Sequence, residues 1–532
     1  MIHVKSTVKL PFLWGKEVFK KENWSQINLI VGPNGSGKSL LAESLVPFFK
    51  KAGYSVAYLQ ANRELSNIQN NSWVKNENIR NRIANVLSGM IGKEISFEKG
   101  FNGRIVPFVV NEKQKVEYSL HKGKIHGLKE IINLLATLYD DKNTCLFLDE
   151  PELHLYPQLQ QFFMNEIRKV AKQNPKKIFF IITHSPFFID LRFPEELVGV
   201  VVTHVNKTPT HIENLSDEDE QLFKRFLPRF NTYHKQFFFS DNQVFVEGYT
   251  DQQMFTNLLN GIKNPMAVVR TGIIDVGGKD ELGVFCKVCS LLGTDGRIIT
   301  DLDSLFGGKV RDIMCQDKRI ADWLDSVYQQ ELPFYLSIFS TKEFNRIIDT
   351  VCLSDLIEKL QQLIAAIGKY VCKIDYSVSK TFDIFVEKLQ KLYEKYENAD
   401  TLDVTQAVLI QGILKEYDML QNILPLPLAR TLPLIKHLYF LILEAAEKAR
   451  VYILSKGCIE HYYTQNHVQF MPVSGKDKLF HAELEHLSHL KTNKLRTEYA
   501  ELIDIFWNEL CINLFFHVYF FYVCTQFLKS SY

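Results

Sequence analysis

Short apolar runs, each closed by polar or turn residues, recur over the first 305 residues of the chain. This pattern is typical of buried strands in a parallel sheet. The clearest runs are residues 27–31, 144–148, 177–182, 243–246, 273–276 and 297–300. Glycine-rich turns and amphipathic stretches follow several of them, so the pattern predicts alternating strands and helices.

Residues 345–445 have a different period. The stretches LIEKLQQLIAAIGKYV (356–371) and FDIFVEKLQKLYEKYE (382–397) carry apolar residues at i, i+3 and i+4, which predicts amphipathic helices. Prolines within ILPLPLARTLPLI (423–435) break the run. We expect a helical insertion here, which serves either as an interaction platform or as a bracing bundle.

The composition indicates a globular protein of several domains. The 532 residues exceed one ordinary core. A net charge of +1, from 62 basic and 61 acidic residues, excludes a polycation, so nucleic-acid binding would need a local basic patch, such as KTNKLR (491–496). The nine cysteines are scattered, which favours a reducing, cytoplasmic environment. The apolar stretch 510–528 is about as long as a membrane span, and we expect it to be a buried helix rather than an anchor.

The turn after the first apolar run has the pattern of a phosphate-binding loop. Residues 32–39, GPNGSGKS, match GxxxxGK[ST], in which backbone N–H groups and a helix N-terminus surround phosphates. Lys38 would reach the β- and γ-phosphates, and Ser39 would hold Mg²⁺. The predicted ATP-binding residues of this loop are Gly32, Asn34, Gly35, Gly37, Lys38 and Ser39.

Two later runs end in residues that would complete such a site. The first delivers Asp149, for the Mg²⁺ shell, and Glu150, which would polarise the attacking water. The second is followed by His184, which would sense the γ-phosphate. A plain glycine turn is the alternative to the phosphate loop, and the order of the three motifs favours the nucleotide switch.

These motifs, in this order, resemble the ABC-type ATPase heads of the RecF, SMC and Rad50 group. The resemblance implies that two heads sandwich ATP, each contributing a signature segment to the other. The matching stretch, residues 121–140, has Gly123 and Gly127 but lacks the usual serine.

The later strands end in acidic residues. Glu247 and Gly248 follow one run, and Asp301 and Asp303 follow another. If the strand continues through both aspartates, their carboxylates point the same way and require a cation between them. A strand ending in Glu-Gly, a helix, a second strand-helix unit and a strand ending in DxD form the TOPRIM pattern. We expect Glu247, Asp301 and Asp303 to bind one or two Mg²⁺ or Mn²⁺ ions that activate water at a phosphodiester.

An ATPase head followed by TOPRIM resembles the OLD (overcoming lysogenization defect) family of ATP-linked nucleases. KGCIEHYY (456–463) matches the family's KGxIExYY run. The resemblance implies that Glu460 joins the metal cluster and that Asp251 serves a second metal. It also implies a lysine that assists transition-state charge, either Lys476 or Lys478, of which Lys478 is preferred.

The chain is therefore predicted to be α/β, with an ABC-type (P-loop) ATPase domain followed by a TOPRIM α/β domain that carries a helical insertion. The predicted segments are the ATPase head (1–235), the first part of TOPRIM (236–344), the helical insertion (345–445), and the second part of TOPRIM with C-terminal helices (446–532). An acidic run at 217–220 predicts the first turn of a helix rather than a binding site.

The predicted function is an ATP-controlled, metal-dependent DNA endonuclease in the cytoplasm, with no membrane partner. The resemblance implies bacterial anti-phage defence and a homodimer or higher assembly through the ATPase heads. Some members of the family work with a helicase-like protein, or with the reverse transcriptase and small DNA of a retron.

Three other functions fit parts of the pattern. One is an ATP-driven DNA-binding clamp or repair scaffold of RecF or SMC type without nuclease activity. The second is another TOPRIM chemistry, primase or topoisomerase, although no strand-passage module is recognisable. The third is a regulator that hydrolyses ATP when a partner signals. Replacing Asp301 would abolish function only if the acids are catalytic.

Overall fold

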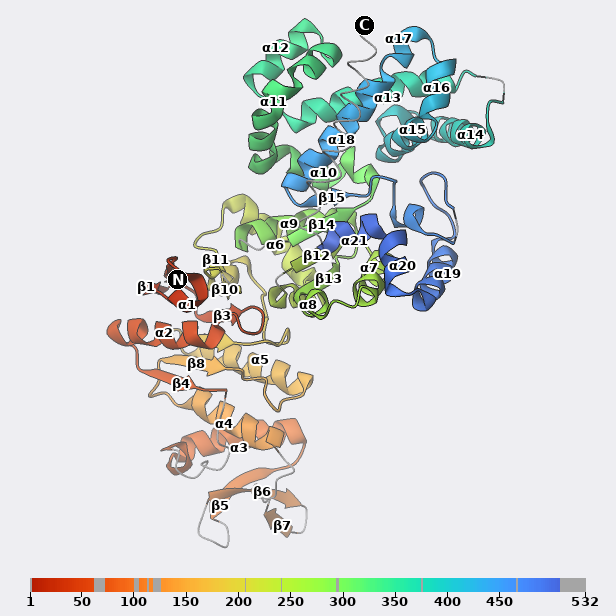
Figure 1. Ribbon diagram of the computed structural model, residues 1–532. Coiled ribbons are helices and arrows are strands. Elements are labelled where there is room, and N and C mark those ends of the chain that lie inside the picture. Colours follow the sequence, from red (N-terminus) through yellow and green to blue (C-terminus); the bar gives the residue numbers. More distant parts are fainter. Residues whose placement is uncertain are drawn as a thin grey trace. The chain divides into compact units, whose positions relative to one another are not determined.

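A computed structural model gives the fold of most of the chain (Figure 1). The described residues are 2–61, 72–99, 105–111, 114–117, 126–205, 207–240, 242–292, 296–374, 377–465 and 467–507. The chain divides into two compact units. The first covers Met1–Asp241 with Leu291–Thr294, and the second covers Asn242–Ser290 and Asp295–Tyr532.

The first unit is built on a six-stranded sheet with the order β11-β10-β3-β9-β8-β4. All neighbours are parallel except the terminal pair β10 and β11. The strands are β3 (Ile27–Val31), β4 (Val56–Leu59), β8 (Cys145–Asp149), β9 (Ile178–Ile182), β10 (Val200–Val202) and β11 (Thr210–His211). Every residue of β8 and β9 is buried, which explains why these strands are apolar up to Asp149, the last residue of β8.

Helices pack on this sheet and on one another, and the unit also contains two small antiparallel sheets. Helix α2 (Lys38–Lys51) packs on β3, β8 and β9, while α3 (Glu77–Ile91), α4 (His126–Tyr139) and α5 (Pro157–Gln173) pack in succession (Figure 1). Strands β1 (Ile2–Val8) and β2 (Phe19–Trp24) form one small sheet. Strands β5 (Ile95–Lys99), β6 (Ile105–Asn111) and β7 (Gln114–Glu117) form the other.

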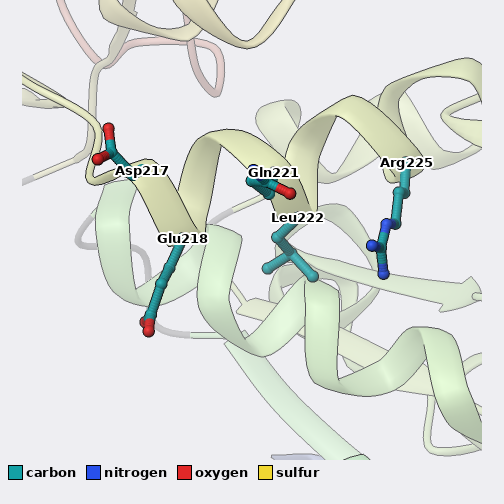
Figure 2. A pocket seen from close by; sticks show the side chains of 5 residues that line it. All are labelled: Asp217, Glu218, Gln221, Leu222 and Arg225. Atoms are coloured by element: carbon teal, nitrogen blue, oxygen red, sulfur yellow. The ribbon is translucent and has the colours of Figure 1, made fainter.

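Helix α6 (Asp217–Phe226) contains the acidic run of the sequence. Ser216 caps it by accepting a hydrogen bond from the Asp219 N–H group, and four acidic residues occupy the first turn. The acidic run is therefore a helix start, as predicted, where negative charge is favoured by the helix dipole. Figure 2 shows the five side chains of α6 that line a pocket. None of them is a candidate site residue.

The second unit contains a four-stranded parallel sheet with the order β13-β12-β14-β15. Its strands are β12 (Asn242–Val246), β13 (Thr271–Asp275), β14 (Gly296–Thr300) and β15 (Val451–Ile453). The main helices connecting or following these strands are α7 (Tyr249–Gly261), α8 (Pro265–Arg270), α9 (Lys279–Leu292), α19 (Lys476–His489), α20 (Thr492–Glu498) and α21 (Ala500–Trp507).

A long helical region separates β14 from β15. It includes α10 (Gly308–Gln316), α11 (Lys318–Ile338), α12 (Thr341–Asp349), α13 (Leu353–Val371), α14 (Lys380–Lys395), α15 (Asp403–Lys415), α16 (Tyr417–Ile423), α17 (Leu426–Ala429) and α18 (Leu432–Lys448). Prolines stand at the starts of α17 and α18, where proline is tolerated. Among the described residues, one helical stretch, Leu426–Lys448, could cross a membrane by length and composition. Its α18 part packs on α11 and α13 as a core helix.

The expected fold class is confirmed: two parallel sheets of α/β type with a helical region. Helices begin at Gly308, before the predicted insertion boundary, and the boundaries of the four segments stay a prediction. The apolar stretch 510–528 and the first five residues of the signature segment, 121–125 with Gly123, lie outside the described residues. The rest of that segment, including Gly127, forms α4 and the residue after it.

Candidate functional sites

The phosphate-binding loop joins β3 to α2. Gly32, Gly35 and Gly37 have φ of +146°, +78° and +83°, a region that favours glycine. A Cβ atom on Gly32 would lie 2.3 Å from the carbonyl oxygen of Thr203. Glycine is therefore required at the first position by both backbone angle and space. Asn34 lies within the same loop.

Lys38 is the buried cation of this loop. Its Nζ donates hydrogen bonds to the carbonyl oxygens of Gly32 (3.0 Å) and Pro33 (2.8 Å). Burial lowers the pKa of Lys38 to about 8, and nearby acidic groups, Glu150 first, oppose the shift. The ammonium thus lies inside the loop that would surround phosphates.

The strand ends bring the second and third motifs to the same edge of the sheet. Because β3, β9 and β8 are parallel neighbours, their carboxyl ends meet there. Ser39 donates a hydrogen bond to Asp149 Oδ1 at 3.1 Å. Tyr58, at the end of β4, donates one to Asp149 Oδ2 at 3.0 Å. The structure therefore brings together the Ser39 and Asp149 pair that was expected to hold Mg²⁺.

Glu150 and His184 lie beside each other past these strand ends. Glu150 has φ of +46°, unusual for a side-chain-bearing residue, and its Oε1 is 3.8 Å from His184 Nε2. Burial and the Lys38 charge lower the pKa of His184 to about 4. Glu152 fixes the histidine loop by accepting hydrogen bonds from Thr183 Oγ1 (2.9 Å) and from the His184 N–H group (2.6 Å).

In the second unit, Glu247 follows β12 and Asp301 follows β14, and these strands are parallel neighbours. Their ends therefore lie together at one sheet edge. Glu247 Oε1 accepts hydrogen bonds from Thr300 Oγ1 (2.5 Å) and from the Asp301 N–H group (2.9 Å). The end of the neighbouring strand β14 thus orients the Glu247 carboxylate.

Asp251 joins this pair from the first turn of α7. Burial, followed by the charges of Glu247 and Glu460, raises the pKa of Asp251 to about 7. Burial and the charges of Glu247 and Asp251 raise the pKa of Asp301 well above its usual value. Lys476 opposes both shifts. Glu247, Asp251, Asp301 and Glu460 thus interact electrostatically with one another and with Lys476. These four carboxylates are the acidic cluster.

Glu460 lies in the short helix η8 (Ile459–Tyr462) and is 1% exposed. Its Oε1 is 3.1 Å from Lys476 Nζ. Lys478, two residues further along α19, is exposed. The preference for Lys478 is corrected here, because the first residue of α19 and not the third reaches the acidic cluster.

Asp301 and Asp303 do not share a strand face, which corrects another expectation. β14 ends at Thr300, Asp301 stands at the N-cap position of the short helix η6 (Leu302–Leu305) without a side-chain capping hydrogen bond, and Asp303 lies in the first turn of η6. Asp303 Oδ2 pairs with Lys279 Nζ at 3.2 Å. The chain thus turns into η6 directly after the strand, and Asp303 has a lysine partner.

The acidic cluster has the donor set of a divalent-cation site. All its ligating atoms would be carboxylate oxygens, which suit Mg²⁺ or Mn²⁺. Asp303 Oδ1 and Glu460 Oε2 are buried and have no hydrogen-bond partner in the described part of the chain. Among the described residues, no three acidic, histidine or cysteine side chains stand close enough together to coordinate an ion as placed. The residues therefore fit a divalent cation by the chemistry of their donor atoms.

Several contacting residues were not found from the sequence. Tyr58, Glu152 and Thr203 support the phosphate site, and Thr300 and Lys279 support the acidic cluster. Glu152 stands inside the motif DEPEL and Thr300 stands one residue before DxD, so proximity to the motifs was the available signal. Nothing in the sequence indicated Tyr58 or Thr203.

Comparison with known proteins gives matches to both units. The family "Overcoming lysogenization defect protein-like, TOPRIM domain" matches residues 238–303, and the AAA ATPase domain family matches residues 126–189. The OLD nuclease of Thermus scotoductus is 27% identical over 171 residues, 31% of this chain and 31% of that protein.

Two further relatives are similarly distant. Endonuclease GajA of Bacillus cereus is 25% identical over 188 residues, covering 31% of this chain and 27% of the relative. The Old nuclease of Escherichia phage P2 is 23% identical over 253 residues, covering 43% of this chain and 42% of the relative. Each match spans less than half of the relative's length. The predicted resemblance to OLD nucleases is confirmed, and the chain carries matches to an AAA ATPase domain and to an OLD-like TOPRIM domain.

Proposed function

We propose that this chain, two parts of which match the AAA ATPase and OLD-like TOPRIM domain families, is an ATP-controlled, divalent-metal-dependent DNA endonuclease. The observation that carries the proposal is the acidic cluster at the carboxyl edge of the second sheet, with Lys476 beside it. Carboxylates gathered at one site, Glu460 buried and the others partly buried, repel one another unless cations balance their charge, and phosphodiester hydrolysis uses such cations.

In this mechanism Glu247, Asp301 and Glu460 would hold Mg²⁺ or Mn²⁺, and Asp251 would serve a second ion. Bound cations supply Lewis-acid activation of water and stabilisation of the leaving oxygen. Thr300 and the Asp301 N–H group hold the Glu247 carboxylate in one orientation. Lys476, 3.1 Å from Glu460, would offset the negative charge that develops on the phosphate in the transition state.

The first unit would bind ATP with Mg²⁺. The loop amides and Lys38 would hold the phosphates, and Ser39 with Asp149 would hold Mg²⁺. Glu150 would orient the attacking water, and His184 beside it would contact the γ-phosphate. Because burial holds the pKa of His184 near 4, the imidazole would be neutral at pH 7 and able to accept or donate a hydrogen bond.

The wider role rests on the resemblance to the OLD family and is proposed on that basis. One relative is named an endonuclease and two are named OLD nucleases, which supports DNA as the substrate. We propose a cytoplasmic location, a dimer formed through the ATPase domains, and a role in anti-phage defence. A defence-system partner would be a helicase-like protein or a retron's reverse transcriptase with its small DNA.

The test separates the two activities with point variants. Purified protein is incubated with supercoiled plasmid in Mg²⁺ or Mn²⁺, with and without ATP, and ATP hydrolysis is measured on the same preparations. Asp301→Ala should lose cutting and keep ATP hydrolysis, whereas Lys38→Ala should lose ATP hydrolysis. Asp477→Ala, an exposed acid of α19, is the matched control and should behave like wild type.

The ATP lanes show whether the nucleotide activates or restrains cutting. Full cutting by Asp301→Ala would reject the nuclease assignment and favour a DNA-binding clamp or repair scaffold.

A further inference from the structure

Helix α15 of the helical region contacts, at two points, the segments that carry Asp303 and Glu460. It runs from Asp403 to Lys415 and packs against η6, the short helix between Asp301 and the following loop. Most of its residues are buried. Residues 304–402 separate its first residue from the DxD motif, so no local pattern links the two.

The first contact is at the start of α15. Lys279 Nζ lies 3.2 Å from Asp303 Oδ2 and 4.0 Å from Asp403 Oδ2. One ammonium group therefore bridges the second aspartate of DxD and an aspartate of the helical region. A Cβ atom on Gly307 would lie 2.2 Å from Asp403 Oδ1, so the chain leaving η6 passes directly over Asp403.

The second contact is two turns further along α15, at Gln411, which is 7% exposed. Its Nε2 donates to the Lys456 carbonyl oxygen (2.5 Å), and its Oε1 accepts from the Met471 N–H group (3.0 Å). The same Nε2 is 3.2 Å from His461 Nε2. These partners lie on both sides of Glu460 in the chain, so one amide holds the loop that presents Glu460.

Gly457 shows how closely Gln411 fits this loop. It has φ of +131°, and a Cβ atom there would lie 2.1 Å from Gln411 Nε2. Its carbonyl oxygen accepts a hydrogen bond from the Leu302 N–H group at 2.7 Å. The Glu460 loop is thus fastened on one side to η6, which follows Asp301, and on the other to α15.

We propose that α15 is a positioning element of the metal site, with Gln411 and Asp403 holding the loops that carry Glu460 and Asp303. This inference rests on the proposed metal-dependent function. It assigns the helical region a part in the nuclease centre, beyond bracing its own helices. Displacement of α15 would move two metal-site loops together, so the helical region can influence metal affinity.

The test compares Gln411→Leu with Gln406→Leu in the full chain. Gln406 is also a buried glutamine of α15, but its amide donates to the Asp400 carbonyl within the helical region. Mn²⁺ binding is measured by isothermal titration calorimetry, plasmid cutting is titrated with Mn²⁺, and thermal midpoints are recorded. Gln411→Leu should weaken Mn²⁺ binding about tenfold, from the loss of hydrogen bonds worth about 1.4 kcal/mol, and excess Mn²⁺ should restore cutting. Gln406→Leu should lower the thermal midpoint without changing Mn²⁺ affinity.

A second pair covers the case in which Gln411→Leu does not fold. Asp403→Asn should weaken Mn²⁺ binding several-fold, because it weakens the anchor of Lys279, while Asp400→Asn should not. Asp400 is its control because it pairs with Lys369 of α13 at 2.6 Å. Unchanged Mn²⁺ affinity in Asp403→Asn and in any folded Gln411→Leu would overturn the inference while the nuclease proposal stands. Failure of wild type to bind Mn²⁺ would overturn both.

Discussion

The two lysines at the start of α19 give the sharpest test of the acidic cluster. Lys476 Nζ is 3.1 Å from Glu460 Oε1, the carboxylate is 1% exposed, and the lysine side chain is 47% exposed. At an effective dielectric constant of about 20, two charges at that distance attract by about 5 kcal/mol. Solvent around the half-exposed lysine reduces this energy, and we expect Lys476→Met to destabilise the second unit by about 2 kcal/mol without metal.

Calorimetric melting in EDTA measures this cost. A change of about 2 kcal/mol corresponds to a fall of roughly 4 °C in the second unit's transition. Lys478→Met makes the same substitution at an exposed position and should leave the transition within about 1 °C, because surface changes cost little. Mn²⁺ should reduce the difference in transition temperature between Lys476→Met and wild type, because a bound cation replaces the lost positive charge. If the transition temperature fell equally in the two variants, or fell further in Lys478→Met, the pairing of Lys476 with Glu460 would be refuted.

Three further variants test other parts of the structure. Gly32→Ala forces a Cβ atom to within 2.3 Å of Thr203 at a left-handed φ, so ATP affinity, measured with a fluorescent analogue, should fall at least about tenfold; unchanged affinity would contradict the loop geometry. Thr300→Val removes a hydrogen bond to Glu247 and should raise the Mn²⁺ concentration for half-maximal cutting about tenfold, with no change counting against the orienting role. Burial raises the pKa of Glu447 from 4.5 to about 7, so folding stability falls as pH rises from about 4.5 to 7. Glu447→Gln should accordingly stabilise the protein at pH 8 by at most about 3 kcal/mol, seen as a higher thermal midpoint, and should leave the midpoint unchanged at pH 4.5. An equal change in midpoint at both pH values would exclude a raised pKa of Glu447.

The strands that carry the candidate site residues at their ends could be predicted from the sequence. The runs before Asp149, Glu247 and Asp301 are β8, β12 and β14, because a strand buried on both faces must be apolar along its length. Parallel neighbours place their carboxyl ends together, so the motif positions at strand ends also followed.

The choice between neighbouring side chains could not be predicted in the same way. Lys476 and Lys478 have the same chemistry, and only the start of α19 at Gly475 decides which one faces Glu460. Asp303 was expected beside Asp301, but the turn into η6 gives it Lys279 as a partner. Which of two neighbouring side chains reaches a partner depends on tertiary packing, and neither hydrophobic periodicity nor a sequence motif determines that packing.

Asp403 and Gln411 could not be predicted for another reason. They lie on a helix of the inserted region, and their partners lie in loops near residues 303, 457 and 471. An aspartate at a helix start and a glutamine in a helix are ordinary features by themselves. Only the folded chain shows that both meet the loops of the acidic cluster.

We propose that the acidic cluster is a metal-dependent nuclease centre. The most direct test is the rate of supercoiled-plasmid cleavage in Mn²⁺ by wild type and by Asp301→Ala, with ATP hydrolysis measured on both preparations. We expect Mn²⁺-dependent cleavage by wild type, loss of cleavage in Asp301→Ala, and equal ATP hydrolysis in the two proteins. Cleavage by Asp301→Ala at the wild-type rate would contradict this proposal.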